Sequence, residues 1–422
     1  MLKNKAPACA VVLAGVMLAG CSSGTGGGNS GDGVEAGTSK EDYIEALRDV
    51  DPIELVLQLP TPPGSAYSLP AENYAAAVEE WSDGQISFNI AYSGSIAGLT
   101  EMENALAEGL VDMGQHRPDY HQSDFPVTSY LGQFLTLHDT HPVAGSLQLM
   151  GAANEMWYDT DAVIEELERN GIKSLIPFTS SGGSELLCRD EAVTSLDTVE
   201  GKSIRVQSAA GAALVEHLGA SSVDVPQPDV YEATQRGVID CMDASFGLAA
   251  TTGVAELTDA WTLNADTPGI PPTTSFDMSL DTWDSLPLAA QQLLWDRLDV
   301  FVESYVIDGG WGSNAEAVET SNAAGLSWNE WDAEASASLS DFWGGFRQDL
   351  ADDPVGGVDG GALLDELTQS HEKWLEIVDE AVDYPEEVAW PDFDEWYSTT
   401  DIDISGWTER FVEEVLLPHR PS

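Results

Sequence analysis

Positive charge is scarce in this chain. Its 422 residues include 16 Lys and Arg against 73 Asp and Glu, a formal net charge of −57 at pH 7. Nucleic acids and anionic membrane surfaces are improbable partners because both would repel it. With 43% hydrophobic residues the chain is not disordered. Its acids must therefore cover a packed surface, where they repel one another unless salt screens them. The composition predicts a halophilic protein in a salty medium outside the cell.

Catalytic and cofactor motifs are also missing. The chain has no GxSxG, no HExxH and no P-loop glycine pattern, and its seven His residues lack metal-ligand spacing. Acidic pairs such as Glu165-Glu166 and Asp352-Asp353 occur, but among 73 acids they arise by chance and are typical of solvated faces. We therefore expect no enzyme, no cofactor and no bound metal. A carboxylate-dyad enzyme is an unsupported alternative.

Long apolar runs are absent apart from residues 6–19. That run is too short to span a bilayer and ends in Leu18-Ala19-Gly20-Cys21, small residues followed by a thiol. It resembles a bacterial lipoprotein signal, which predicts a signal peptide over 1–20 and a lipid on Cys21. An uncleaved anchor is the alternative, disfavoured because no further apolar run follows. The Gly- and Ser-rich residues that come next indicate a flexible tether, which we place at 21–50.

Cysteine is rare, with four residues in the chain. Cys9 belongs to the predicted signal peptide and Cys21 to its end, which leaves Cys188 and Cys241. In an exported protein two remaining cysteines favour a disulfide over a metal or redox site, because no CxxC or His-rich spacing is present. The residues alone leave the pairing open.

What the chain does have is an alternation of strands and helices. Roughly 380 residues after the tether fit two lobes better than one core. Apolar runs predict strands at 53–59, 86–92, 111–113, 174–178, 204–206 and 222–225, and helical spacing predicts helices at 69–81, 141–157, 161–169, 209–218 and 229–235.

The most specific segment is 201–243, which reads GKSIRVQSAAGAALVEHLGASSVDVPQPDVYEATQRGVIDCMD. It resembles the best-defined stretch of the DctP-type solute-binding proteins of TRAP transporters, whose pattern runs roughly "GlkiRvp, ten residues, lGa.pv.mp..evYealqrGvvDg.e.p". Residues 84–126 also resemble this family at their turns, and the resemblance extends over about 55–382. The matching positions in 201–243 are Gly201, Ile204, Arg205, Val206, Gly219, Ala220, Val223, Pro226, Val230, Tyr231, Gln235, Arg236, Gly237 and Asp240.

The resemblance implies a two-lobed α/β fold like that of periplasmic binding proteins of the class II type, with a hinge. It places 51–182 and 270–312 in lobe I and 183–269 and 313–382 in lobe II. A long helix that starts at 285–287 and continues past Tyr305 is expected to span both lobes. Residues 383–422 have no counterpart and form an acidic C-terminal extension. The resemblance also puts Cys188 and Cys241 on adjacent strands, which favours their pairing.

The resemblance implies a carboxylate site as well. In the family the Arg of the "GlkiR" strand grips the solute's carboxylate through paired hydrogen bonds, a role suited to the guanidinium fork. Arg205 occupies that position; the alternative is a lobe–lobe salt bridge. Arg117 falls where relatives contact the solute from the first lobe; its alternative is a surface ion pair with Asp119.

Several positions depart from the family pattern. Glu185 stands where some relatives have a second Arg, which argues against sialic acid as the solute. A metal ion held by Asp243, as in some relatives, is disfavoured. Ser181 belongs to a Ser/Gly-rich turn after a strand, a common ligand rim and a common plain loop. We expect the pocket to be lined by Gln227, Asp243, Phe246, Glu185 and Ser181, with Tyr67 or Tyr120 closing over it.

The chain is thus identified as a TRAP-type solute-binding lipoprotein, anchored on the outer face of the cytoplasmic membrane, in a periplasm or on a cell surface. It would capture a small organic carboxylate between two lobes and deliver it to small and large integral membrane subunits. The alternatives are an ABC-type or tripartite tricarboxylate-type binding lipoprotein, a secreted carboxylate-processing enzyme and a surface adhesin.

Overall fold

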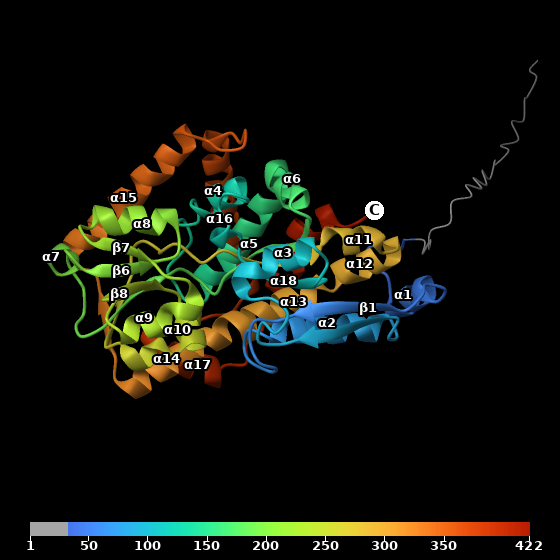
Figure 1. The fold of residues 1–422 in the computed structure, drawn as a ribbon, viewed down its shortest axis with the longest axis horizontal. Helices are drawn as coiled ribbons and strands as arrows, with labels where there is room; N and C mark the ends of the chain where they lie inside the picture. Colours follow the sequence, from blue (N-terminus) through green and yellow to red (C-terminus); the bar gives the residue numbers. More distant parts are fainter. Residues whose placement is uncertain (1–32) are drawn as a thin grey trace, which may run out of the picture.

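The computed structural model describes residues 33–422 and contains two β-sheets with helices packed around each. In Figure 1 the first sheet and its helices lie on the right, and the second sheet lies on the left. We call the two parts the first and the second lobe. The predicted signal peptide and the predicted lipidation site, Cys21, lie outside the described residues.

The first lobe is built on a five-stranded sheet with the order β2-β1-β3-β10-β4. β1 pairs in parallel with β2 and β3, whereas β10 is antiparallel to both β3 and β4. Helices α2 and α6 have the bounds that apolar spacing predicts. The elements are β1 (Ile53–Gln58), α2 (Leu69–Trp81), β2 (Ile86–Ala91), α3 (Met102–Ala107), β3 (Met113–His116), α4 (Pro126–Gly132), α5 (Ala144–Asp159), α6 (Asp161–Arg169), β4 (Ile172–Thr179) and β10 (Thr274–Ser279).

The second lobe is built on a six-stranded sheet with the order β11-β9-β5-β8-β6-β7. Cys188 and Cys241 face each other in the antiparallel pair β5–β8 and form a disulfide with an S–S distance of 2.11 Å. The elements are β5 (Glu185–Cys188), α7 (Leu196–Val199), β6 (Ser203–Val206), α8 (Ala209–His217), β7 (Ser221–Asp224), α9 (Val230–Gln235), β8 (Cys241–Ala244), α10 (Phe246–Thr252), β9 (Ala260–Leu263), β11 (Ser327–Glu330) and α15 (Ala333–Asp352).

Two loop segments connect the sheets, 180–184 after β4 and 264–273 before β10, and they lie against each other. Ser184 Oγ donates to the carbonyl of Ile270 at 2.8 Å, and Asn264 Nδ2 donates to the carbonyl of Ser184 at 2.8 Å. A Cβ on Gly269 would lie 2.0 Å from the Ser184 carbonyl oxygen. Only glycine at position 269 allows the two connecting loops to pack this closely.

Helices make the third connection between the lobes. The expected long helix begins at Leu288 rather than at 285, because Pro287 is extended and Ser285 belongs to the preceding helix, α11 (Leu280–Ser285). The run is interrupted at Arg297 and contains a π-helical segment, Tyr305–Trp311. Its parts are α12 (Leu288–Asp296), α13 (Leu298–Ser304), the π-helix and α14 (Gly312–Ala324).

One acidic pair was misinterpreted from the sequence. Glu165 is exposed, but Glu166 is 1% exposed and does not belong to a solvated face. Its carboxylate accepts hydrogen bonds from the backbone N–H of Val127 at 2.7 Å and of Thr128 at 2.8 Å. A carboxylate at the first turn of a helix satisfies free N–H groups there, and Glu166 does this for α4.

Both ends of the described chain are packed on the first lobe. The tether was expected to reach residue 50, but α1 (Lys40–Leu47), begun by a capping box at Ser39, buries Tyr43 and Leu47. Helix α16 (Gly360–Ala381), which the predicted boundaries assign to lobe II, packs along α5. A Cβ on Gly151 of α5 would lie 2.1 Å from the Trp374 ring, so the helices meet there without a side chain between them. The lobe boundaries themselves remain a prediction.

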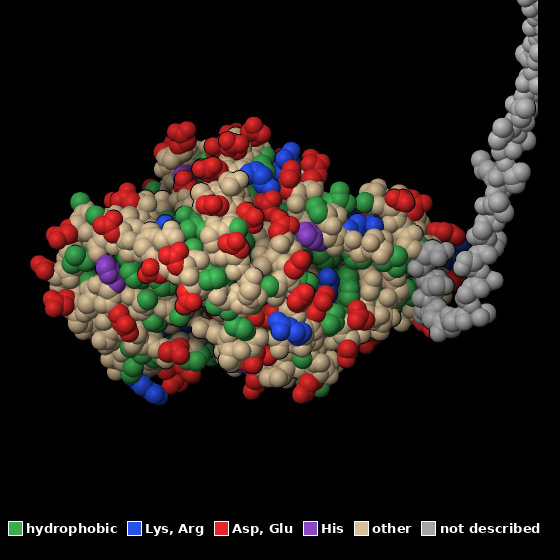
Figure 2. Space-filling view, turned by 90° about the horizontal axis from the view of Figure 1, so that it is seen from above, with side chains coloured by type: hydrophobic (Ala, Val, Ile, Leu, Met, Phe, Trp, Pro, Cys, Tyr) green, Lys and Arg blue, Asp and Glu red, His purple; other side chains and the backbone are tan. Residues whose placement is uncertain are grey.

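The extension beyond 382 contains α17 (Phe393–Thr399) and α18 (Ser405–Phe411) and buries Phe393, Trp407 and Phe411. Within residues 33–422 no helix combines the length and apolarity needed to cross a bilayer. Acidic side chains are scattered over the whole face shown in Figure 2, where basic ones are few.

Candidate functional site

A cavity of about 470 Å³ lies between the lobes, a size typical of small-molecule sites. The first lobe contributes residues at the carboxyl ends of β1 and β3, and the second contributes residues around α9 and α10. Tyr67, Ser181 and Gln227 line this cavity, as does Arg117. These four of the predicted solute residues therefore lie around one cavity between the lobes.

Arg205 lies on β6 and is 1% exposed. Its Nε donates to the carbonyl of Val225 at 3.0 Å, and its Nη1 has no hydrogen-bond partner anywhere in residues 33–422. The lobe–lobe salt bridge, which was the alternative, is not formed with any described acid. Burial lowers the pKa of Arg205, and the charges of Tyr120 and Asp243 oppose this shift. Arg205 is not among the side chains that line the cavity, although Gln207, two residues along, is.

Arg117 is different, because its charge is already paired. It is 5% exposed, and its Nε donates to Asp119 Oδ1 at 2.9 Å while Nη2 bonds the other carboxylate oxygen. The guanidinium also lies over the ring of Tyr120, 4.7 Å from its centre. Burial lowers the pKa of Arg117, but the charge and hydrogen bonds of Asp119 outweigh it and raise the pKa overall. The pair that was the surface alternative thus stands at the cavity wall, with Arg117 buried and Asp119 half-buried.

Two acids of the second lobe, Asp243 and Glu185, form no ion pair with Arg205, although Asp243 lies close enough for the two charges to interact. Burial raises the pKa of Asp243 to about 7, while the charge of Arg205 opposes the shift. Burial also raises the pKa of Glu185, to about 8. The charge of Asp243 raises this pKa further, whereas a hydrogen bond from the Asn264 N–H at 2.6 Å lowers it. Both acids line a separate, smaller cavity of about 40 Å³. Near neutral pH Asp243 is therefore only partly ionised and offsets the charge of Arg205 incompletely.

Phe246 and Tyr120 are not placed at the cavity surface. Phe246 packs in the core, with ring centres 4.7 Å from Trp261 and 4.3 Å from Trp390. Tyr120 packs against Arg117, and its hydroxyl is buried without a partner among the described residues.

Sequence reasoning missed several cavity residues. Gln58 is the last residue of β1 and Gln115 the last but one of β3, so the rule that ligands bind beyond the carboxyl ends of strands could have found them. Gln58 also fixes the loop above the cavity, because its Oε1 accepts from the N–H groups of Ile96 at 2.7 Å and Ala97 at 3.0 Å. Tyr231, a motif position, also lines the cavity, together with Ser245, Leu248 and Tyr305.

Among the described residues one group could hold a metal ion: Glu103, His121 and Asp124. None of these side chains lines the 470 Å³ cavity. The predicted solute residues do not form such a group within residues 33–422.

The chain is similar to known proteins in both sequence and structure. The family model described as bacterial extracellular solute-binding protein, family 7, matches residues 60–337. A marine metagenome TRAP solute-binding protein specific for aromatic acid ligands, in complex with 3-hydroxybenzoate, is 20% identical with a TM-score of 0.65, over 77% of this chain and 99% of that one.

Two further solved structures are similar. A TRAP periplasmic solute-binding protein from Bordetella bronchiseptica with bound mandelate is 19% identical with a TM-score of 0.64, over 76% of this chain and 99% of that one. A marine metagenome protein specific for pyroglutamate is 16% identical with a TM-score of 0.63, over 76% and 99% of the two chains. These likenesses show a shared two-lobed fold.

Proposed function

The chain belongs to family 7 of the bacterial extracellular solute-binding proteins, and we propose that it is the lipid-anchored receptor of a TRAP transporter for a small organic carboxylate. The observation that carries this proposal is Arg205. It is a buried cation with a free Nη1 in a chain with 16 Lys and Arg against 73 acids. Burying an unpaired charge is costly, so such a group is maintained where an anionic ligand completes it.

The surroundings of Arg205 support a carboxylate with a single negative charge. Arg117 is neutralised by Asp119, so the site offers one uncompensated cation to the solute. The rest of the cavity combines neutral polar groups with apolar ones, including Gln58, Gln227, Tyr231 and Leu248. The similar proteins named above bind pyroglutamate, 3-hydroxybenzoate and mandelate, all monocarboxylates. We propose a solute of this kind for this chain.

Arg205 does not reach the cavity surface in the described arrangement, so we propose that lobe movement completes the contact. Binding would bring the solute's carboxylate against Nη1 as the lobes close about their three connections. The membrane subunits would then recognise the closed form. Gln227, Asp243, Glu185, Ser181 and Tyr67 would complete the site from both lobes.

A thermal-shift screen of organic acids in high salt tests the proposal. At a hundredfold excess over its dissociation constant, a solute should add about 2.7 kcal/mol to the free energy of unfolding. The neutral amide of each acid is the matched control, and recovery of the solute unchanged separates binding from turnover. If no acid in a broad panel stabilises the protein more than its amide, the carboxylate-receptor proposal is rejected.

The lipid anchor requires a separate test, because Cys21 lies outside the described residues. The Cys21→Ser variant should appear in the soluble fraction rather than with membranes. Membrane association that is unchanged in this variant would remove the lipoprotein claim while leaving the solute site untouched.

A further inference from the structure

The C-terminal extension, 383–422, lies outside the part of the chain that the family model matches, 60–337. It follows α16, which packs on α5 of the first lobe. In Figure 1 the red end of the chain runs from α17, beside α14 on the left, past α18 to the C-terminus on the right. The extension thus runs along the helices that connect the two lobes.

The first part of the extension contacts the second lobe and the connecting loop 180–184. The ring of Trp390 lies 4.3 Å from that of Phe246, the first residue of α10, and a Cβ on Gly182 would be 4.0 Å from Trp390. Asn322 of α14 donates to the carbonyl of Pro391 at 3.1 Å. Ser181 and Ser245, the neighbours of Gly182 and Phe246, line the solute cavity. Trp390 therefore supports two walls of the cavity from behind.

The middle of the extension covers the π-helical segment. Trp396 packs edge-on against Trp311, with ring centres 5.7 Å apart. A Cβ on Gly312 would lie 3.1 Å from the Tyr397 hydroxyl. The covered segment contains Gly309 and Gly310. A π-helical turn with adjacent glycines is a place where a long helix bends readily.

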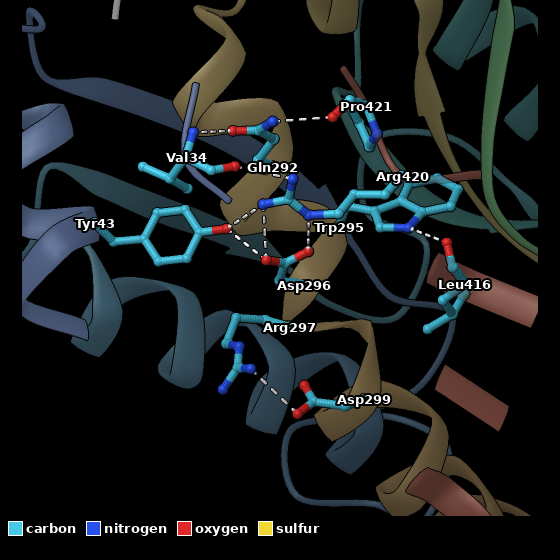
Figure 3. Close-up of polar contacts among 10 residues, drawn as sticks. All are labelled: Val34, Tyr43, Gln292, Trp295, Asp296, Arg297, Asp299, Leu416, Arg420 and Pro421. Atoms are coloured by element: carbon cyan, nitrogen blue, oxygen red, sulfur yellow. Dashed lines mark hydrogen bonds and ion pairs between the residues drawn. The ribbon is translucent and has the colours of Figure 1, made fainter. Parts of the chain in front are cut away.

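The last part returns to the first lobe and ends in a clasp, which Figure 3 shows. Arg420 Nε and Nη2 donate to the two carboxylate oxygens of Asp296 at 2.7 and 3.1 Å, and Nη1 donates to the carbonyl of Val34 at 3.0 Å. Tyr43 donates to the same carboxylate at 2.6 Å. Gln292 joins both chain ends, because it accepts from the Val34 N–H at 2.7 Å and donates to the Pro421 carbonyl at 3.0 Å.

We propose that residues 383–422 are a splint along the interlobe helix, fixed at one end by Trp390 and at the other by Arg420, which limits bending at the π-helix and positions the walls of the solute site. Hinge closure concentrates backbone change in a few residues. A segment that bridges those residues resists bending, because bending would break its contacts on one side. Trp390 is in this sense a positioning residue for the solute site.

The first test needs no solute and is independent of the proposed function. Spin labels at Ala76→Cys on α2 and Glu216→Cys on α8, both exposed positions in different lobes, report the interlobe distance distribution in the full chain. Trp390→Ala and Arg420→Gln should each broaden this distribution or shift its mean. Phe88→Ala is the aromatic control, half-buried in the first lobe against Tyr74, and Arg410→Gln is the matched arginine control, because Arg410 pairs within the extension with Glu414.

A distribution that stays unchanged in both variants, while both remain folded by circular dichroism, overturns the splint. Equal broadening in the controls also overturns it, because the effect would then reflect general destabilisation.

A second measurement rests on the proposed function. With the best acid from the screen, Trp390→Ala should change affinity by about three- to tenfold, since a shifted equilibrium between lobe arrangements changes apparent affinity. If no acid binds the parent, the proposed function fails and the distance measurement still decides on the splint. If acids bind equally well to parent and Trp390→Ala, the positioning role fails alone.

Discussion

The two walls of the cleft use arginine in opposite ways. On the second-lobe side Arg205 is buried with a free Nη1 and is not paired with any described acid. On the first-lobe side Arg117 is equally buried but is held by Asp119 and stacked on Tyr120. Burial alone therefore does not identify a ligand-binding cation. The presence or absence of a protein carboxylate within hydrogen-bond distance distinguishes the two.

The acids nearby extend the contrast. Asp119 forms an ion pair with Arg117, so its charge is neutralised within the first lobe. Asp243 is half-buried and Glu185 is buried, both without such a partner, and loss of hydration raises their pKa values to about 7 and about 8. The second-lobe wall can therefore change its net charge near neutral pH, because its acids gain or lose protons there. The first-lobe wall keeps its internal pair.

Replacing Arg205 should have the largest effect. Arg205→Ala should weaken carboxylate binding by about 2 to 5 kcal/mol, roughly 30-fold to several thousandfold, because the solute's charge would lose its partner. Arg205→Lys should also fail, because an ammonium group cannot form the paired bonds of a guanidinium. Calorimetric titration measures the affinity, and the melting temperature without solute checks the fold.

The matched control is Arg117→Ala, which removes a buried arginine from the other wall. We expect it to weaken binding far less than Arg205→Ala. If Arg205→Ala binds within about threefold of the parent while folded, Arg205 is a structural arginine and the contrast between the walls fails.

Carboxylate affinity should fall as pH rises from about 6 to 9. Asp243 loses its proton in this range, and its charge then offsets that of Arg205. We expect affinity to decrease by about tenfold over this range, which corresponds to about 1.4 kcal/mol of binding free energy. Asp243→Asn, which cannot ionise, should flatten the profile measured by titration at each pH. A parent profile that is flat or rises with pH contradicts this assignment of the second-lobe acids.

The same groups affect stability with a defined sign. The pKa values of Asp243 and Glu185 are higher in the folded state than in the unfolded state. At pH values between the two, the folded state therefore binds more protons than the unfolded state. Their contribution is fully present below pH about 4 and is lost as pH rises to about 8. Asp243→Asn should reduce this loss in denaturant titrations.

Breaking the first-lobe pair should have a smaller effect in the opposite direction. Asp119→Asn frees the charge of Arg117, which lines the cavity, so carboxylate affinity should rise. We expect a rise of about threefold to fivefold, because one charged hydrogen bond to the solute replaces one that Arg117 would otherwise make with water. Asp124→Asn, an exposed acid in the same segment, is the control. An affinity that falls in Asp119→Asn would show that the pair itself positions the wall.

The sequence predicts the α/β alternation well because local apolar spacing decides it. Helices α2 and α6 begin and end where that spacing places them. Contacts between distant segments were not predictable in this way. Tyr43 docks on Asp296, 253 positions along the chain, so residues of the expected tether are packed. Glu166 is buried because its partners, Val127 and Thr128, lie on another helix.

The candidate site shows the same limit. The motif singles out Arg205, but it cannot show which face of α10 meets the cavity. Ser245, Leu248 and Thr252 line the cavity at helical spacing, and this turns Phe246 toward Trp261 and Trp390. Trp390 lies beyond residues 60–337, the part of the chain that the family model matches, so the motif could not reveal this contact.

Salt concentration should change the stability that depends on the acidic surface, and it should have only a small effect on the contribution of Arg205 to binding. The screening length is about 3 Å at 1 M and about 10 Å at 0.1 M, so repulsion among exposed acids grows on desalting. The melting temperature should therefore fall as salt is removed, and a flat or rising value would contradict the halophilic interpretation. Buried pairs are screened much less. The ratio of parent to Arg205→Ala affinity should accordingly stay within about threefold between these concentrations, even as both affinities shift. A ratio that falls to one at 1 M would mean that Arg205 attracts anions over a distance, as a surface charge does, rather than binding the carboxylate directly.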